Sequence, residues 1–551
     1  MLLHVTVASA IATSAHALGA LQQDPLMDKE RYAAACPDYR SYSSHQHPPF
    51  SLGTLRLPFQ RPAPQCRTFS SPLVETVIQD LNERIQDKDI ARLFENAFPN
   101  TLDTTVRWHV DGTQPKKERS KAYSDTYYSL NEGKWEGPQS FIVTGDINAE
   151  WLRDSTNQLA QYQTLAKKDK ALENLILGAI NTQAEYVIES PYCNAFQPPP
   201  PSGLDPTGNG QMDSTHPFYE PSRVFECKWE LDSLAAFLRL SNQFHNSTGS
   251  TAFLTKRWFK AANTIMDTLE AQARSTFDEN GDYERNMYTF QRNTNTGTET
   301  LSLTGVGNPL ANNTGLIRSA FRPSDDATIL GFLVPANAMM AVELKATAAL
   351  LNKSAPKKDA DTTALHEKMA SVAASIEKGI WDHAVFTHPV FGRVFAYEVD
   401  GYGSRIFMDD ANLPSLLALP LMGFLPSSNE VYQNTRRMVL SQAGNPYYLK
   451  GANFAGIGGP HIGLQHAWPM SVLLQAMTSE DDIEISRCIE AVRNVSSLGL
   501  INESVHVMFG GDTTRSWFAW ANSVFAQTVL DVAKRKPHLL FGEGKEPYEI
   551  L

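Results

Sequence analysis

Charged, aromatic and hydroxyl side chains are concentrated in the short stretch from Thr144 to Ser155. Gly145 and Asp146 favour a tight bend and a helix start, because glycine accepts unusual backbone angles and an Asp oxygen can accept from free helical amides. We predict that a helix begins near Ala149. Trp151 and Asp154 would then share one of its faces.

Arg153 and Asp154 lie next to each other beside Trp151. Bidentate charged groups next to an apolar ring are what a site needs to hold a polyhydroxylated ligand. The alternative is a capped helix with a surface ion pair, which adds little stability. The residues themselves allow both interpretations.

Asp232 follows Trp229 by three residues and precedes Ala236 by four, so it lies at the edge of an apolar helical face. Burial against apolar groups raises the pKa of a carboxyl, and a carboxylic acid that keeps its proton can protonate a leaving glycosidic oxygen. A buried Asp satisfied by backbone amides is the alternative.

Two acidic pairs, Asp325–Asp326 and Asp409–Asp410, each precede an apolar run that predicts a helix. An Asp in this position can cap the helix and need have no other purpose. Two adjacent carboxylates exceed what a cap requires, because like charges repel. We therefore also consider both pairs as binders of sugar hydroxyls.

His461 and His466 are five residues apart, which is not the i, i+4 spacing of a helical zinc site. The sequence predicts no metal and no cofactor. It also contains no glycine-rich phosphate loop and no nucleophile elbow. His466 with Trp468 suits sugar stacking and hydrogen bonding, and a capped helix start with a core tryptophan is the alternative.

Helical periodicity dominates the chain and convincing strands are few. Apolar spacing predicts twelve helices, and six antiparallel pairs of them would close into an all-α (α/α)6 toroid. Long loops at 191–226 and 285–325 would shape one rim. The predicted helices are 72–96, 149–166, 171–189, 228–244, 252–276, 327–350, 363–381, 411–423, 428–442, 466–478, 480–496 and 516–534.

Hydrophobic residues make up 42% of the 551 residues, charged residues make up 20%, and the net charge is −12. This composition predicts a soluble globular protein, and the negative charge argues against a nucleic-acid partner. No apolar run reaches the roughly 18 residues of a membrane span.

Residues 1–20 are small and apolar, and Ala15-His16-Ala17 matches a signal-peptidase site, so we predict a secretory signal peptide. No Lys or Arg precedes the apolar stretch, which leaves a cytosolic N-terminus as the alternative. We expect an extended arm over 21–71 and a catalytic domain over 72–540. Secretion would permit N-glycosylation at four sequons. These begin at Asn246, Asn312, Asn352 and Asn494.

Five cysteines are too few for a fold built on disulfides. In an oxidising compartment, Cys36 with Cys66 and Cys193 with Cys227 are plausible bridges, since each pair brackets a proline-rich excursion. Cys488 would then be a free thiol within a helix. The sequence leaves the pairing open.

Four motifs resemble, in order, those of glycoside hydrolase family 125, the metal-independent exo-α-1,6-mannosidases. They are Thr144–Ser155, Cys227–Leu234, Asp409–Leu416 and Ser516–Ser523. The resemblance extends from about residue 70 to about residue 535. It strengthens the prediction of a toroid and implies a mannose-containing oligosaccharide or N-glycan as the substrate.

The resemblance also implies roles for two carboxylates. Asp232 falls in the motif that carries the family's general acid, and Glu503 falls in the stretch that carries its general base. Asn502 begins a sequon, and a glycan there would obstruct the base, so we expect this sequon to be unoccupied. Asp512 is the alternative base. We predict substrate contacts from Asp146, Trp151, Arg153, Asp154, Asp325, Asp326, Asp409, Asp410, Asn412, His466 and Trp517.

The sequence thus predicts an inverting exo-α-1,6-mannosidase with Asp232 as acid and Glu503 as base. Another toroidal glycosidase with a different sugar specificity is a second hypothesis, because carboxylates and tryptophans indicate a sugar without identifying it. A secreted glycan-binding protein without turnover is a third.

Overall fold

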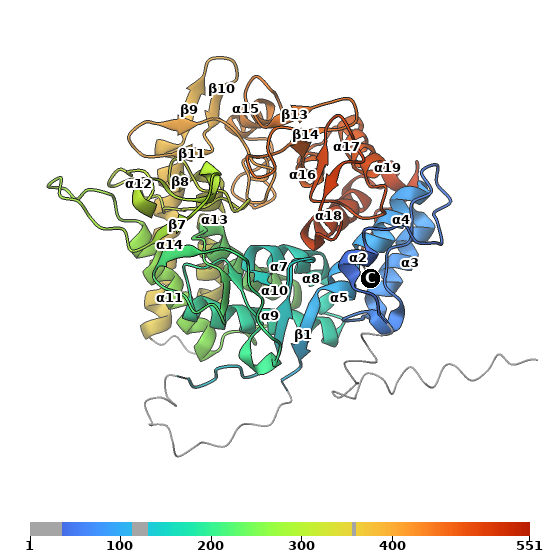
Figure 1. The fold of residues 1–551 in the computed structure, drawn as a ribbon, viewed down its shortest axis with the longest axis horizontal. Coiled ribbons are helices and arrows are strands. Elements are labelled where there is room, and N and C mark those ends of the chain that lie inside the picture. Colours follow the sequence, from blue (N-terminus) through green and yellow to red (C-terminus); the bar gives the residue numbers. More distant parts are fainter. Residues whose placement is uncertain (1–35, 113–130, 355–359, 551) are drawn as a thin grey trace, which may run out of the picture.

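The computed structural model describes residues 36–112, 131–354 and 360–550. The predicted signal peptide and the start of the predicted arm lie outside these residues. Helices surround a common centre, and the chain passes once around it from the N-terminal to the C-terminal segment (Figure 1). This is an (α/α)6 toroid, as the helical periodicity predicts.

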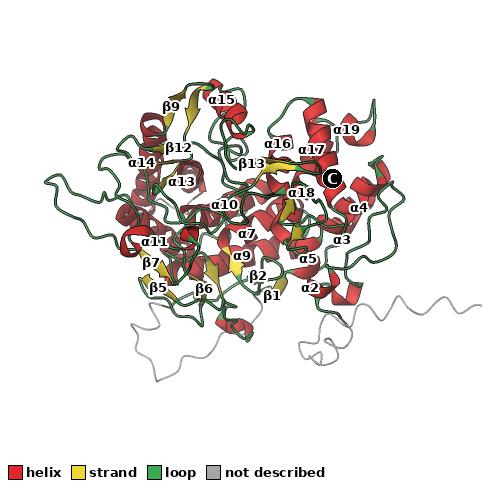
Figure 2. Cartoon of the chain, turned by 45° about the horizontal axis from the view of Figure 1, so that its top comes forward, coloured by secondary structure: helices red, strands yellow, loops and turns green. Residues whose placement is uncertain are grey.

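Helices account for most of the regular structure (Figure 2). The longer ones are α3 (Pro72–Arg84), α4 (Lys88–Ala97), α7 (Leu152–Leu159), α9 (Lys170–Glu189), α10 (Leu231–Thr248), α11 (Lys256–Gln272), α13 (Val334–Ser354), α14 (Ala360–His383), α15 (Glu430–Val439), α16 (Pro469–Met477), α17 (Asp482–Val495) and α18 (Ala519–Arg535). Shorter ones are α2 (Tyr39–Tyr42), α5 (Asn100–Thr104), α8 (Gln163–Ala166), α12 (Ser302–Gly305) and α19 (His538–Phe541).

An inner ring is formed by α7, α10, α13, α16 and α18. Within it α7 packs on α10, α10 on α13, α16 on α18 and α18 on α7. Every residue of α7 is buried. The outer helices pack against this ring, with α14 on α13 and α17 on α16. Apolar side chains between the two layers form one continuous core.

Local sequence signals define many helix ends. Ser71 accepts from the Val74 amide ahead of Pro72, and Asp169 accepts from the first amides of α9. Gly249 ends α10 with a φ of +73°, a conformation that favours glycine.

The predicted helix at 411–423 is wrong. The segment consists of turns and bends, although Leu416 to Leu419 are fully buried. Pro414 and Pro420 lack the N–H groups that helical hydrogen bonds require. Instead, the Leu416 and Leu417 amides donate to the Asp409 carboxylate, at 2.9 Å each.

Two predicted helix starts are also wrong. Glu150 and Trp151 form a short strand, so the helix predicted near Ala149 begins at Leu152. The helix predicted at 327 begins at Val334, so Asp325 and Asp326 do not cap it. Asp325 has a φ of +67°, which places it in a turn. The helix predicted over 72–96 is divided into α3 and α4.

The described strands are short and form seven two- or three-stranded sheets, all with antiparallel pairing. The sheet β3–β4–β6 pairs Glu150 with Phe196 and Trp151 with Ala195. The strands are β1 (Val106–Val110), β2 (Gln139–Ile142), β3 (Glu150–Trp151), β4 (Ala195–Phe196), β5 (Asp213–His216), β6 (Val224–Glu226), β7 (Thr289–Arg292), β8 (Phe332–Leu333), β9 (Val385–His388), β10 (Gly392–Phe395), β11 (Glu398–Val399), β12 (Arg405–Ile406), β13 (Tyr448–Lys450), β14 (Ala455–Ile457), β15 (His466–Ala467), β16 (Ser504–His506) and β17 (Thr513–Thr514).

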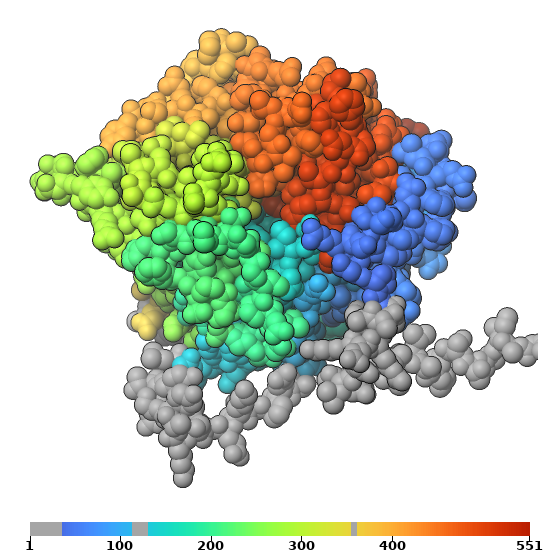
Figure 3. Space-filling view, in the orientation of Figure 1, coloured from blue at the N-terminus to red at the C-terminus, as the bar shows by residue number. Residues whose placement is uncertain are grey.

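Residues 36–71 are mostly irregular and lie against α4 and the C-terminal part of the chain. The Gln60 amide donates to Asn96, and Tyr39 packs edge-on against Trp517. In the space-filling view the N-terminal segment touches the C-terminal one, which closes the ring (Figure 3). Among the described residues, no helix has both the length and the apolarity needed to cross a bilayer.

Both expected disulfides are present, one between Cys36 and Cys66 and one between Cys193 and Cys227. Cys488 is a free buried thiol within α17, as expected. Burial raises its pKa to about 12, so it is a packing residue at neutral pH.

Candidate active site

A cavity of about 440 Å³ opens at one end of the ring. Its wall comes largely from the segments that precede the inner helices and from the first turns of α7 and α18, with further residues from the loops around 208–211 and 292–299, so residues far apart in sequence meet there. The lining residues are Thr144, Ile147, Trp151, Arg153, Asp154, Gly208, Asn209, Gln211, Phe225, Glu226, Lys228, Arg292, Glu299, Pro323, Ser324, Asp325, Asp326, Asn412, His461, Trp468, Glu503, Arg515, Phe518 and Trp520.

Arg153 and Asp154 line this cavity and are not a surface ion pair. Their exposed fractions are 2% and 4%, and the Arg153 Nη2 lies 3.2 Å from the Asp154 Oδ1. Arg153 also lies over the ring of Trp520, 5.2 Å from the centroid. Burial raises the pKa of Asp154 to about 6, although Arg153 opposes this shift. Asp154 is therefore a buried acceptor held by an arginine.

The predicted general acid Asp232 does not line the cavity. It is fully buried on α10, and its Oδ2 lies 3.3 Å from the Arg153 Nη1. Burial raises its pKa, as the sequence pattern suggests, and Arg153 opposes the rise. Its contact with Arg153 makes it a supporting residue behind the wall, so its position does not favour direct contact with substrate.

Two other carboxyls, Glu230 and Asp325, meet beside Asp232. The Asn194 Nδ2 donates to both, to the Glu230 Oε1 at 3.1 Å and to the Asp325 Oδ1 at 3.1 Å. Burial raises the pKa of Glu230, and the adjacent Asp325 carboxyl raises it further. Glu230 is buried behind the wall, whereas Asp325 is half-buried and lines the cavity.

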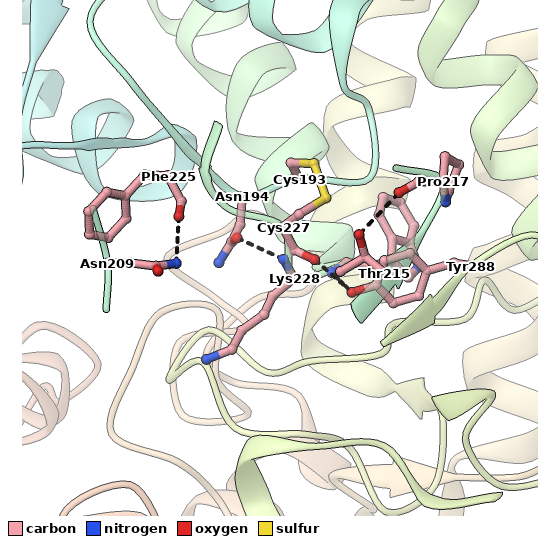
Figure 4. Close-up of a disulfide and its surroundings, with 10 residues drawn as sticks. Cys193, Asn194, Asn209, Thr215, Pro217, Phe225, Cys227, Lys228 and Tyr288 are labelled. Atoms are coloured by element: carbon pink, nitrogen blue, oxygen red, sulfur yellow. Dashed lines mark hydrogen bonds between the residues drawn. A yellow bond between two sulfur atoms is a disulfide. The ribbon is translucent and has the colours of Figure 1, made fainter. Parts of the chain in front are cut away.

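The neighbours of Asp325 fix its position on the wall. Trp151 Nε1 donates to its Oδ1 at 3.4 Å, and strand β3 orients that tryptophan. Asn194 and Lys228 adjoin the disulfide between Cys193 and Cys227, and the Lys228 amide donates to the Asn194 Oδ1 at 3.0 Å (Figure 4).

Glu503 faces the cavity immediately before β16. Its Oε2 accepts from the Thr514 hydroxyl at 2.9 Å, and its Oε1 accepts from the Arg515 Nη1 at 3.1 Å. Asp146 holds the other edge of Arg515, through Nε at 2.9 Å and Nη2 at 2.6 Å. Asp146 thus positions this arginine, and it neither caps a helix nor lines the cavity.

Asp512, the alternative base, lies outside the cavity with 63% of its side chain exposed. Asn502 is buried, and its Nδ2 donates to Thr513 at 3.2 Å. A glycan on that buried nitrogen would break this contact, so an occupied sequon does not fit this fold.

Asp326 and Asn412 line the cavity, as their predicted substrate contacts require. The Asp326 Oδ2 is buried without a hydrogen-bond partner and lies 3.9 Å from the His461 Nδ1. A buried acceptor without a donor is suited to a sugar hydroxyl. Burial raises the pKa of Asp326, and His461 opposes this.

Besides Asp146, four predicted substrate contacts lie outside the cavity lining. Asp410 accepts from Ser324 and Asn412, and Asp409 anchors the 411–423 turns. His466 lies 3.9 Å from Asp512. Trp517 donates to Thr104 at 2.9 Å and packs on the N-terminal segment. These residues support the wall or the ring closure, because each faces a neighbouring element.

Several wall residues were missed at the sequence level. Trp520, Phe518 and Arg515 lie within or beside the Ser516–Ser523 motif, but that motif does not indicate which of its aromatics faces inward. Trp468, which the sequence pairs with His466 for sugar stacking, does line the cavity, whereas His466 does not. The cavity thus combines aromatic rings, carboxylates and arginines, a set suited to a sugar.

Comparisons with known proteins agree with this geometry. The family model described as metal-independent alpha-mannosidase (GH125) matches residues 87–530. The meiotically up-regulated gene 157 protein of Schizosaccharomyces pombe is 52% identical over 508 residues, covering 92% of this chain and 94% of that protein.

A solved structure of a metal-independent α-mannosidase from Streptococcus pneumoniae, in a non-productive complex with α-1,6-mannobiose, superimposes with a TM-score of 0.72. It is 31% identical, and the match covers 84% of this chain and 99% of that one. This chain therefore belongs to glycoside hydrolase family 125, the metal-independent α-mannosidases.

Proposed function

We propose that this enzyme removes terminal α-1,6-linked mannose from the non-reducing ends of oligosaccharides or N-glycans, with inversion at the anomeric carbon. The observation that carries the proposal is a single cavity in which Asp325 and Glu503 both line the wall. The α-1,6-mannobiose bound by the Streptococcus pneumoniae relative supports the linkage.

Asp325 replaces Asp232 as the proposed general acid. An acid must reach the glycosidic oxygen, and Asp325 lines the cavity whereas Asp232 lies behind it. Asp325 also lies beside Glu230, whose buried carboxyl has a raised pKa and can supply a proton to this position. Asp154, beside Arg153, and Asp326, beside His461, also line the cavity and are suited to holding sugar hydroxyls.

Asp325 protonates the glycosidic oxygen as the bond from that oxygen to the anomeric carbon breaks. Glu503 accepts a proton from the water that adds to the opposite face of the ring. An inverting pair leaves room for this water, with its carboxyls about 6.5–9.5 Å apart. Arg515 and Thr514 hold Glu503 in one orientation for this step.

Incubation with α-1,6-mannobiose and with its α-1,2 and α-1,3 isomers tests the linkage. We expect hydrolysis of the α-1,6 isomer at least about tenfold faster, a difference of about 1.4 kcal/mol in the activation barrier. Equal rates on all three isomers would contradict the proposal. Tight mannoside binding without hydrolysis would indicate a glycan-binding protein instead.

Proton NMR of the first product tests the stereochemistry. Inversion releases β-mannose, which then mutarotates, so β-mannose must precede α-mannose. Initial release of α-mannose would exclude inversion. A strong chelator should leave the rate unchanged, and loss of activity that calcium or zinc restores would contradict a metal-independent reaction.

We further propose that the protein passes through the secretory pathway. Two disulfides are typical of an oxidising compartment, and Asn246, Asn312, Asn352 and Asn494 are all exposed. Treatment of the protein from its native host with an N-glycosidase should lower its apparent mass. No change in mass would contradict occupancy of these sequons.

A further inference from the structure

We infer that Glu230 is the positioning residue that holds the catalytic proton for Asp325. Asn194 binds both carboxyls through one amide nitrogen, at 3.1 Å each. Glu230 lies behind the wall, out of reach of substrate, and Asp325 lies on the wall. The inference rests on the proposed role of Asp325 as the general acid and extends it to a two-carboxyl unit.

Asp325 needs such a partner because its surroundings favour the ionised form. Burial opposes ionisation, but Lys228 and Arg153, together with the hydrogen bond from Glu230, lower the pKa of Asp325. An isolated Asp325 in this position would have lost its proton at neutral pH. It could then not donate to the glycosidic oxygen.

The surroundings of Glu230 favour its protonated form. It is 1% exposed, and burial raises its pKa well above the usual range, although Arg153 opposes the shift. Its Oε2 accepts from the Arg153 Nη1 at 2.6 Å and from the Ser233 hydroxyl at 3.1 Å, which leaves Oε1 on the side of Asn194 and Asp325. The shared proton therefore rests on Glu230 in the free site.

Other charged groups face this pair from the surrounding elements. Their charges act on both carboxyls, and two carboxyls that interact this closely titrate as one unit with two macroscopic steps. These groups are Arg153 and Asp154 on α7, Lys228 and Asp232 at the start of α10, and His461 ahead of α16.

One proton moves from Glu230 to the glycosidic oxygen by way of Asp325. As the bond from the anomeric carbon to the glycosidic oxygen breaks, its electron pair stays on that oxygen, which takes a proton from Asp325 as Asp325 receives the one held by Glu230. The Glu230 proton passes to Asp325 along their hydrogen bond as this charge develops. The pair is then one proton short and regains it from solvent, while Glu503 holds the proton of the added water.

Glu230→Gln tests the inference, because glutamine keeps the shape and can donate to Asp325 but has no acidic proton to transfer. We expect kcat/KM for α-1,6-mannobiose to fall at least about a hundredfold. The loss for 2,4-dinitrophenyl α-mannoside, whose leaving group needs no proton, should stay below about tenfold. The alkaline limb of the kcat/KM profile for mannobiose should move to lower pH.

Asp325→Asn is the reference variant and Asp232→Asn is the matched control. Asp325→Asn should show the same selective loss, since it removes the acid. Asp232 touches the same arginine but lies away from the proton path, so its variant should lose activity equally on both substrates. Glu230→Asp keeps a carboxyl but places it farther from Asp325, so its selective loss should be smaller. This variant provides the test if Glu230→Gln does not fold.

The outcomes separate the two proposals. Equal losses on both substrates for Asp325→Asn would overturn its role as acid and thus the proposed mechanism. Selective loss for Asp325→Asn with equal losses for the Glu230 variants would overturn this inference alone. Selective loss in both, with the shifted alkaline limb, supports a proton held by Glu230.

Discussion

At the scale of single residues, the cavity contains a carboxyl whose burial costs stability. Asp154 is buried against Arg153, and its raised pKa of about 6 means that its charged form is disfavoured by the fold. Arg153 keeps two further carboxylate partners, Glu230 and Asp232. Removing the charge of Asp154 therefore leaves Arg153 paired.

Asp154→Asn should lower kcat/KM for α-1,6-mannobiose at least about a hundredfold, or about 2.7 kcal/mol, because hydrogen bonds to the sugar strengthen in the transition state. The Tm at pH 7 should stay the same or rise, since the neutral amide avoids the cost of a buried charge. Steady-state kinetics and thermal melts measure the two effects. Near-normal turnover with a clearly lower Tm would show that Asp154 only holds α7 in place.

At the scale of elements, backbone amides of the 411–423 segment donate to a carboxylate side chain and not to the carbonyl groups of a helix. Asp409 accepts from the Leu416 and Leu417 amides, so an irregular segment remains packed in the core. A buried amide without an acceptor costs about 1–3 kcal/mol.

Asp409→Ala should therefore lower the free energy of unfolding by about 2–6 kcal/mol, because two buried amides lose their acceptor. Urea unfolding followed by circular dichroism measures this loss. Asp267→Ala on the surface of α11, where 81% of the side chain is exposed, is the control and should change little. A stability equal to that of the wild type would mean that these amides find other acceptors.

The two disulfides enclose similar lengths of chain, with sequence separations of 30 and 34 residues. They differ in what they adjoin. The bridge between Cys193 and Cys227 is flanked by Asn194 and Lys228, which surround the acid. The bridge at Cys36 fastens the N-terminal segment near Trp517.

The double variants Cys193→Ser/Cys227→Ser and Cys36→Ser/Cys66→Ser should each lose about 3–4 kcal/mol of stability by loop entropy. Only the first should also lose kcat at temperatures where both are folded, because its loop carries Asn194 and Lys228. Denaturant melts and kinetics on the folded variants compare them. Equal kcat in both would show that the bridge between Cys193 and Cys227 does not affect the geometry of the acid.

At the scale of the whole molecule, a buried carboxyl links stability to pH. Glu150 is fully buried, and burial raises its pKa to about 8. The unfolded chain has a pKa of about 4.3 for this group, so the folded state binds more protons between these values. Its contribution to stability is complete below the unfolded pKa and is lost as the pH rises through 8.

We therefore expect the Tm to fall from pH 5 to pH 8. Glu150→Gln should flatten this dependence and melt higher than the wild type at pH 8, because the amide does not ionise. Glu83→Gln on the exposed face of α3 is the control. An unchanged slope for Glu150→Gln would show that other groups cause the dependence.

The sequence by itself determined the helical architecture, because apolar side chains spaced for a helix and polar caps act over a few residues. It also identified Arg153, Asp154 and Glu503, whose motifs lie on the cavity wall. It failed at 411–423, where an apolar run packs in the core without a helix, because its amides bond to Asp409.

Only the tertiary structure decided which carboxyl faces the cavity. The sequence assigned the acid to Asp232 and a sugar contact to Asp325, but α10 turns Asp232 behind Arg153 while a turn before α13 brings Asp325 to the wall. The same is true of Glu230, which the sequence alone did not single out. Its contact with Asp325 arises from residues 95 positions apart in the chain, and local periodicity carries no information about such a contact.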